Sequence, residues 1–113
     1  MNKTIGFIGI GNVGSHLANN LLKSKNNIYV YDKNIKSYSN LINLKNKPCK
    51  NLEEIAMKSQ IIITCLPSPK AVKNVIKTIS KYLNKNHLWI EMSTTDKDEM
   101  IKLSKIVNLK GVK

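Results

Sequence analysis

A glycine-rich turn near the amino terminus constrains the fold more than any other part of this chain. The turn, Gly9-Ile10-Gly11-Asn12-Val13-Gly14, follows an apolar run and precedes a segment with helical spacing. Gly9 lets the chain reverse out of the strand, Gly11 removes a Cβ that would keep a pyrophosphate from the backbone amides, and Gly14 allows the helix to pack close to the strand. The turn therefore predicts the start of a βαβ unit that binds a dinucleotide.

Two further features of this unit support the same prediction. The amino end of the helix offers free N–H groups and the positive end of its dipole to the phosphates. Asp32 stands at the carboxyl end of the next predicted strand, where a carboxylate accepts hydrogen bonds from ribose hydroxyls and repels a 2′-phosphate, so we predict NAD in preference to NADP. Two alternatives stay open: Asp32 caps the next helix only, or Lys33 beside it softens the repulsion.

The remaining segments alternate between strand and helix patterns. The apolar run at 60–66 is continuous, which is typical of a strand covered on both faces. The alternation predicts an α/β fold with a doubly wound parallel sheet, strand order 3-2-1-4-5, as one domain over residues 1–113. The predicted strands lie near 4–8, 28–31, 48–50, 60–66 and 88–92, and the predicted helices lie at 12–24 and begin after Asn34, Asn51, Ser68 and Thr95 or Asp96.

The predicted ligand site is the edge of the sheet where the strand order reverses. Four segments would meet there: the glycine turn, Asp32, Leu66-Pro67 and Ser93-Thr94. Proline and Ser/Thr residues also occupy purely structural corners, so for the last two pairs the structural alternative stays open.

The net charge of +12 raises the question of a nucleic acid or membrane partner. The lysines are scattered over every segment, no aromatic residues interleave with them, and Arg is absent. We therefore predict a solvated basic surface that binds neither nucleic acid nor membrane. No apolar run has the length of a membrane span and the first strand begins near Thr4, so we expect a cytoplasmic protein, or a mitochondrial matrix protein if a targeting segment was removed.

Cysteines and histidines give no catalytic or metal site. Cys49 and Cys65 form no C-x-x-C pair, and Cys65 is predicted to be a small buried hydrophobe within its strand. His16 lies in the first helix and His87 precedes the last strand, so both are predicted to be ordinary surface residues. No residue of the chain is assigned as catalytic.

Four motifs together resemble the amino-terminal half of the β-hydroxyacid dehydrogenases, with 3-hydroxyisobutyrate dehydrogenase as the most similar branch. They are G-F-I-G-I-G-N-V-G, Y-D, I-I-I-T-C-L-P and E-M-S-T-T, in that order. The resemblance implies a Rossmann domain of an oxidoreductase that moves hydride between NAD and a small 3-hydroxy acid. It also implies that Leu66 and Pro67 line the adenosine and ribose side, that Thr94 reaches the nicotinamide ribose, and that Ser93 lies near the substrate.

The chain departs from the family pattern in several places. Val13, Lys25 and Glu91 replace the family's Met, Gly and Asp, and Ala71 replaces an Asn that touches the cofactor in some members. Members of the family continue into a sixth strand and a helical domain with the catalytic Lys. We therefore expect a truncated NAD-binding portion that is inactive alone and that self-associates, as a homo-oligomer, through its exposed fifth strand. The alternative is a stand-alone dinucleotide-binding or redox-sensing module without turnover.

Overall fold

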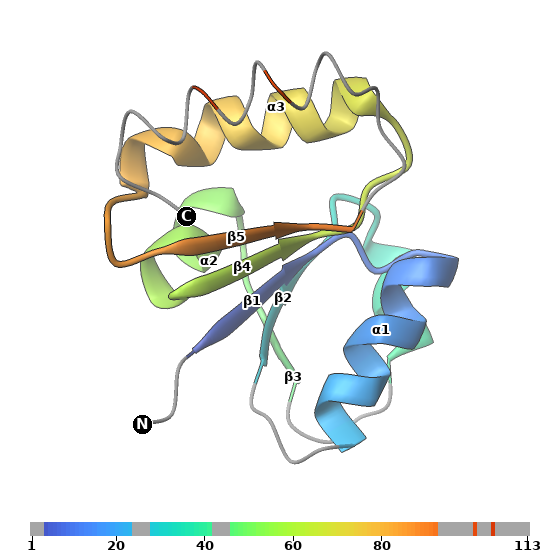
Figure 1. Ribbon diagram of the computed structural model, residues 1–113. Coiled ribbons are helices and arrows are strands. Elements are labelled where there is room, and N and C mark those ends of the chain that lie inside the picture. Colours follow the sequence, from blue (N-terminus) through green and yellow to red (C-terminus); the bar gives the residue numbers. More distant parts are fainter. Residues whose placement is uncertain (1–3, 24–27, 42–45, 93–100, 102–104, 106–113) are drawn as a thin grey trace.

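The sheet of the protein has the predicted architecture. A computed structural model describes residues 4–23, 28–41, 46–92, 101 and 105. Within them, five parallel strands pair in the order β3-β2-β1-β4-β5, which confirms the predicted strand order (Figure 1). The strands are β1 (Ile5–Ile8), β2 (Ile28–Tyr31), β3 (Asn46–Pro48), β4 (Ile61–Thr64) and β5 (Leu88–Glu91).

Helices cover both faces of this sheet. Helix α1 packs on one face, whereas α2 and α3 pack on the other (Figure 1). This arrangement follows from right-handed crossovers, because connections that move in opposite directions along a parallel sheet cross on opposite faces. The helices are α1 (Asn12–Lys23), α2 (Leu52–Lys58) and α3 (Pro69–Ile79), with short 3₁₀ helices η1 (Ile35–Asn40) and η2 (Ser80–Tyr82). None of the helices in the described segments is long and apolar enough to cross a membrane.

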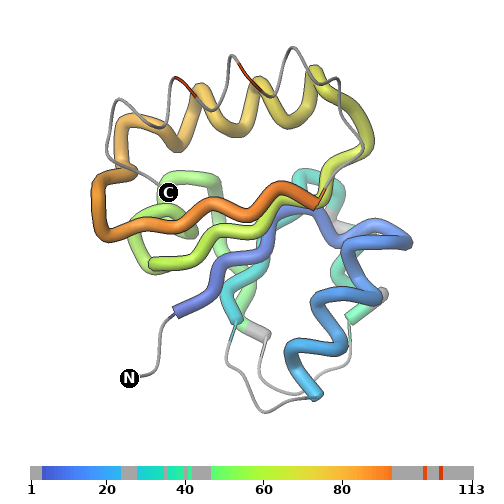
Figure 2. Tube along the Cα trace, viewed as in Figure 1, coloured from blue at the N-terminus to red at the C-terminus, as the bar shows by residue number. Residues whose placement is uncertain are grey.

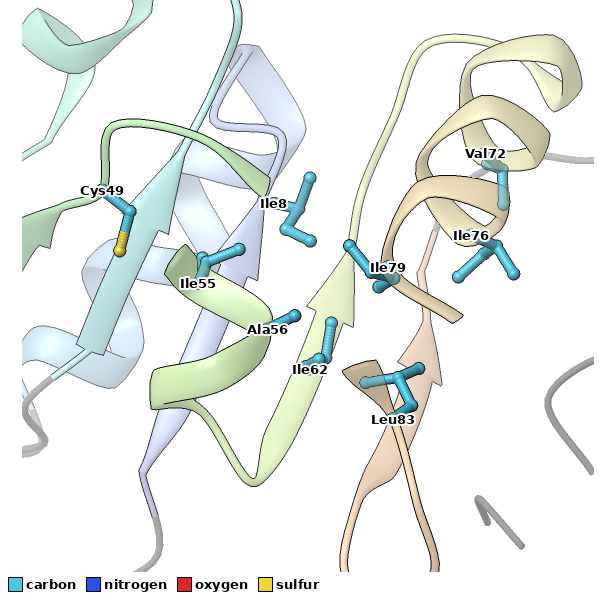
Figure 3. Close-up of a cluster of buried hydrophobic side chains, with 9 residues drawn as sticks. All are labelled: Ile8, Cys49, Ile55, Ala56, Ile62, Val72, Ile76, Ile79 and Leu83. Atoms are coloured by element: carbon cyan, nitrogen blue, oxygen red, sulfur yellow. The ribbon is translucent and has the colours of Figure 1, made fainter. Parts of the chain in front are cut away.

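The strands divide their side chains between two cores. Successive residues of a strand point to opposite faces, so Phe7 of β1 belongs to the α1 side and Ile8 to the side of α2 and α3. Figure 3 shows the second core, in which α2 and α3 contribute Ile55, Ile76 and Ile79. Strand β1 is therefore packed on both faces, and its carboxyl end is held firmly where the glycine turn begins.

Side-chain caps explain where the helices after β3 and β4 begin. Asn51 Oδ1 accepts from Glu54 N at 2.8 Å, and Ser68 Oγ accepts from Ala71 N at 3.1 Å. Both caps were predicted, since Asn and Ser satisfy the amides that the first turn leaves open. The Glu54 side chain accepts from Lys50 N at 2.7 Å. Lys50 thus belongs to the approach to α2, and the strand predicted near 48–50 ends at Pro48 instead.

One other predicted element differs from the structure, and one is not tested by it. The helix predicted after Asn34 is the 3₁₀ helix η1, in which Ser37 N donates to Asn34 O and Leu41 N donates to Tyr38 O. These bonds span three residues rather than four, so the segment is a tighter and shorter helix. The helix predicted to begin at Thr95 or Asp96 lies largely outside the described residues.

Strand β5 is at one edge of the sheet. Leu88 and Ile90 are exposed on it, on the face that α1 covers over β1 and β2. An exposed apolar edge of this kind is what the sequence predicts, and self-association through it stays a prediction.

Candidate functional site

A cleft of about 920 Å³ opens at the carboxyl edge of the sheet. The ends of β1, β4 and β5 converge there (Figure 2). Its lining includes Gly9, Gly11–Gly14, Asp32, Leu66 and Pro67, which were predicted to meet at this edge. Ser93 and Thr94, the other two predicted positions, lie outside the described residues.

The three glycines of the turn differ in what surrounds them. Gly9 has φ +97°, and a Cβ on Gly9 would overlap the Cys65 carbonyl oxygen. A Cβ on Gly14 would overlap the Gly9 carbonyl oxygen, whereas a Cβ on Gly11 would meet nothing within 4 Å. The conformational reasons predicted for Gly9 and Gly14 are thus confirmed. Gly11 instead borders open space at the amino end of α1, where an anion is favoured.

Ile10, which was predicted to bind the cofactor with the rest of the turn, does not contribute its side chain to the cleft. That side chain is fully buried in the α1 core. Its N–H donates to Asp32 Oδ2 at 2.9 Å. The residue between the first two glycines is thus an anchor of the turn, because the apolar side chain is better buried than placed beside phosphates.

Asp32 ties the glycine turn to the end of β2. Besides Ile10 N, its carboxylate accepts from Asn34 N at 2.8 Å through Oδ1. The cap of η1 is Asn34 rather than Asp32, since Asn34 Oδ1 accepts from Lys36 N at 3.1 Å. Each carboxylate oxygen can accept more than one hydrogen bond, so Asp32 can serve both the turn and a ligand hydroxyl in the cleft.

Tyr38 supports the Asp32 position from η1. Its hydroxyl accepts a hydrogen bond from Asp32 N at 3.1 Å. Burial raises the pKa of Tyr38, and the negative charge of Asp32 also contributes to the increase. The phenol is therefore neutral at physiological pH and stays a hydrogen-bond partner of the β2 end.

One face of α3 forms a wall of the cleft, and sequence reasoning had considered only Ala71 among its residues. Ala71, Asn74 and Thr78 recur at helical spacing and all line the cleft. The helical spacing of these residues can be read from the sequence, but it indicates a binding surface only once α3 is known to border the cleft. The other lining residues not predicted for the site include Lys33, Asn34, Ser37, Leu52, Lys70, Val75 and Met92.

The comparisons with known proteins agree with this geometry. The family model described as the NAD binding domain of 6-phosphogluconate dehydrogenase matches residues 4–113. The chain belongs to this family. Its fold and cofactor class are those of an NAD-binding Rossmann domain, as the sequence predicts.

Relatives of this NAD-binding domain confirm the resemblance to the β-hydroxyacid dehydrogenases. The probable mitochondrial 3-hydroxyisobutyrate dehydrogenase of Dictyostelium discoideum is 38% identical over 83% of this chain and 30% of its own length. The 3-sulfolactaldehyde reductase of Escherichia coli is 33% identical over 95% of this chain and 37% of its own length. The domain thus spans about a third of the length of these relatives.

A solved structure shows the same fold. The 3-hydroxyisobutyrate dehydrogenase of Mycobacterium tuberculosis, determined with L-serine, superposes with a TM-score of 0.91 at 20% sequence identity. The match covers 99% of this chain and 38% of that protein. The NAD-binding domain therefore has the fold of the amino-terminal part of that protein.

The structure corrects the prediction for Cys65. The residue follows β4, is half-buried and lines the cleft, whereas it was predicted to be a buried hydrophobe within the strand. Burial raises the pKa of Cys65, and the negative charge of Glu91 adds to the increase. The thiol is therefore neutral at physiological pH and contributes a small, uncharged surface to the NAD-binding domain.

Neither histidine lines the cleft. His16 is exposed on α1. His87 Nδ1 accepts from Asn84 N at 3.0 Å, so Nε2 carries the proton and donates to Ala56 O at 3.3 Å. His87 thus fixes the turn before β5 to the end of α2. The described residues also contain no cluster of His, Cys, Asp and Glu side chains that could hold a metal ion.

Proposed function

We propose that this domain binds NAD across its glycine turn and holds the nicotinamide for hydride exchange with a small 3-hydroxy acid. The observation that carries the proposal is the open space over Gly11, at the amino end of α1 and inside the cleft. Gly9 and Gly14 are required by the packing of the protein itself, but nothing in the described structure uses the space over Gly11. A pyrophosphate would fill that space and complete the anion site.

The proposed binding residues follow from this position. The main chain of Gly9, Gly11, Asn12, Val13 and Gly14 would hold the pyrophosphate. Asp32 would accept hydrogen bonds from the adenosine ribose.

The rest of the cleft would hold the two ends of the dinucleotide. Leu66 and Pro67 would line the adenosine and ribose side. Thr94 would reach the nicotinamide ribose and Ser93 would lie beside the substrate, as the family resemblance implies. The predicted preference for NAD over NADP depends on the Asp32 carboxylate.

The proposed reaction divides its tasks between the cofactor and the protein. The nicotinamide supplies or accepts the hydride, and the protein supplies position and an acid/base group for the alcohol proton. The titratable residues that line the described cleft are Tyr31, Asp32, Lys33, Cys65 and Lys70. Asp32 is engaged with the turn and the Cys65 thiol is neutral, so neither is suited to this proton transfer.

The 113-residue chain is expected to bind the cofactor without turning over a substrate. The assay follows NADH formation with 3-hydroxyisobutyrate, L-serine and D-glycerate. Clear turnover by this chain would contradict this expectation. It would show that an acid/base group lies within these 113 residues.

The binding proposal is tested with Gly11→Val. A Cβ at this position meets no protein atom within 4 Å, and a branched side chain would occupy the space of the pyrophosphate, so NADH binding should be lost while circular dichroism stays unchanged. His16→Val, on the exposed face of α1 outside the cleft, is the matched control and should bind NADH as the wild type does.

Added salt distinguishes specific binding from attraction to the basic surface. Binding through the glycine turn should persist when salt is raised, whereas attraction of phosphates to scattered lysines should fade steeply. Full NADH affinity in Gly11→Val, or loss of wild-type binding in moderate salt, would contradict the proposed site.

A further inference from the structure

Three side chains cross-link the carboxyl ends of β4 and β5. Trp89 Nε1 donates to Thr64 Oγ1 at 2.9 Å, and Thr64 Oγ1 donates to Glu91 Oε2 at 2.9 Å. Thr64 and Glu91 are also direct partners in the strand register. Two side chains of one strand thus hold a single hydroxyl of the next strand.

The direction of these bonds is determined by the groups involved. An indole N–H can only donate and a carboxylate can only accept, so the Thr64 hydroxyl must accept from Trp89 and donate to Glu91. Thr64 is fully buried. Removal of its hydroxyl therefore breaks both bonds and leaves the Trp89 N–H without this acceptor inside the protein.

This cross-link lies directly beside the cleft. The main-chain oxygen of Thr64 accepts from Met92 N at 2.8 Å. Met92, after β5, and Cys65, after β4, both line the cleft. The distance between these two walls is thus set by the side chain and the main chain of Thr64 together.

The adenosine side of the cleft is held by different contacts. There, Asp32 binds Ile10 N in the glycine turn and Asn34 N before η1. None of these contacts involves β4 or β5. Strand β4, which leads to Leu66 and Pro67, is also paired with β1, whereas β5 is the edge strand. Loss of the β4–β5 cross-link therefore displaces the segment after β5 and leaves the adenosine side in place.

We propose that Thr64, Glu91 and Trp89 are positioning residues for the nicotinamide half of the site. The proposal rests on the proposed function, in which the segment after β5 borders that half. The three residues determine the positions of the cleft walls at Cys65 and Met92, and Thr64 binds both of the other two. They set the spacing into which the nicotinamide riboside fits, whereas the glycine turn and Asp32 bind the adenosine diphosphate portion.

The test compares NADH with ADP-ribose, which lacks the nicotinamide. The wild-type chain should bind NADH more tightly than ADP-ribose. Thr64→Val keeps the shape of the side chain but removes its hydroxyl, so NADH affinity should fall about fivefold while ADP-ribose affinity stays unchanged. NADH is used because its nicotinamide ring is uncharged, which keeps the charge of Glu91 out of the comparison.

Thr4→Val is the matched control for this substitution. Thr4 Oγ1 accepts from Gln60 N at 3.1 Å at the opposite end of the sheet. The control therefore also removes a threonine hydroxyl with a hydrogen-bond partner, and both affinities should equal those of the wild type.

Glu91 variants separate hydrogen bonding from charge. Glu91→Gln retains an oxygen that can accept from Thr64 and should bind NADH nearly as the wild type does. Glu91→Ala removes one of the two bonds and should lower NADH affinity by less than Thr64→Val does. Trp89 is the single tryptophan of the chain, so its emission spectrum should shift in Thr64→Val and stay unshifted in Thr4→Val.

The outcomes separate this proposal from the proposed function. Absence of both NADH and ADP-ribose binding in the wild type would refute the dinucleotide site itself. If the wild type binds both ligands, the positioning role is overturned by equal affinities for the two, by an equal loss of both in Thr64→Val, or by unchanged NADH affinity in that variant.

Discussion

The two halves of the sheet edge are held together in different ways. At the end of β1, the main chain itself sets the geometry, because Gly9 has a positive φ and Gly14 lies against the Gly9 carbonyl. At the ends of β4 and β5, a buried hydroxyl bridges Trp89 and Glu91. The glycine turn is recognisable as a sequence motif because only glycine fits its backbone geometry. The β4–β5 cross-link uses Thr, Trp and Glu, which occur in many strands. Motif analysis can therefore predict the glycine turn of such a site but not the contacts at the ends of β4 and β5.

Gly14→Ala is expected to have the largest effect on this comparison, because a Cβ there overlaps backbone and cannot be relieved by a rotamer change. The free energy of unfolding should fall by about 3 kcal/mol. Urea unfolding followed by circular dichroism measures it, with Gly11→Ala as the matched control. Equal stability of the two variants would show that the turn is not packed as described.

Asp32→Ala should have the next largest effect, confined to the adenosine half. NAD affinity should fall about tenfold, because a charged hydrogen-bond acceptor is lost, and the discrimination against NADP should shrink. Calorimetry with both cofactors measures the change, and Glu53→Ala on the exposed surface of α2 is the control for lost negative charge. Equal NAD and NADP dissociation constants in the wild type would contradict the role assigned to Asp32.

Tyr38→Phe tests the support of the same half and should cost about 1 kcal/mol of stability at neutral pH. The pKa of Tyr38 is raised above its ordinary value of 10.0, so the folded state favours the neutral phenol. The wild-type chain should therefore lose stability as pH rises above about 10, as the unfolded phenol ionises first.

The Phe variant should lack that part of the loss. Unfolding curves of both proteins between pH 8 and pH 11, in steps of about half a unit, provide the comparison. Parallel pH profiles for the two would show that Tyr38 is not shielded by the β2 end.

Alkylation of Cys65 should show the smallest effect and tests the side of the cleft formed by β4. The raised pKa of its thiol predicts slow reaction with iodoacetamide at neutral pH and faster reaction as pH rises, because the thiolate is the reactive form. Bound NADH should slow it further by covering the cleft. The Cys49→Ala background leaves Cys65 as the single cysteine of the chain. Cys49 itself is buried, and burial and the negative charge of Glu54 raise its pKa to about 11. Rapid labelling at neutral pH would contradict this environment.

Local signals in the sequence predicted most of the framework. The apolar runs and the caps at Asn51 and Ser68 indicated the strand and helix order, and the structure confirms the sheet order and both caps. The prediction failed where a local pattern is compatible with either an α-helix or a 3₁₀ helix. The segment after Asn34 carries helical spacing, but bonds over three residues make it a 3₁₀ helix that packs Tyr38 against the β2 end.

The candidate site could be predicted only at positions where the residue type points to a single physical role. Asp32 was recognisable by its place after a strand, yet its bond to Ile10 N, which makes Ile10 an anchor of the turn, was not. Asn74 and Thr78 of the α3 wall were missed because they are common helix-surface residues. Their role depends on which helix face borders the cleft.

By itself, the sequence determined the glycine turn, the order of the sheet and the class of ligand, because backbone sterics and the two hydrophobic periods act over a few residues. The tertiary structure alone decided that Cys65 faces the cleft and that Thr64 is bridged by Trp89 and Glu91. Those contacts join residues that are 25 and 27 positions apart. Such pairs exist only after parallel strands have come into register, and no pattern within either strand encodes its partner.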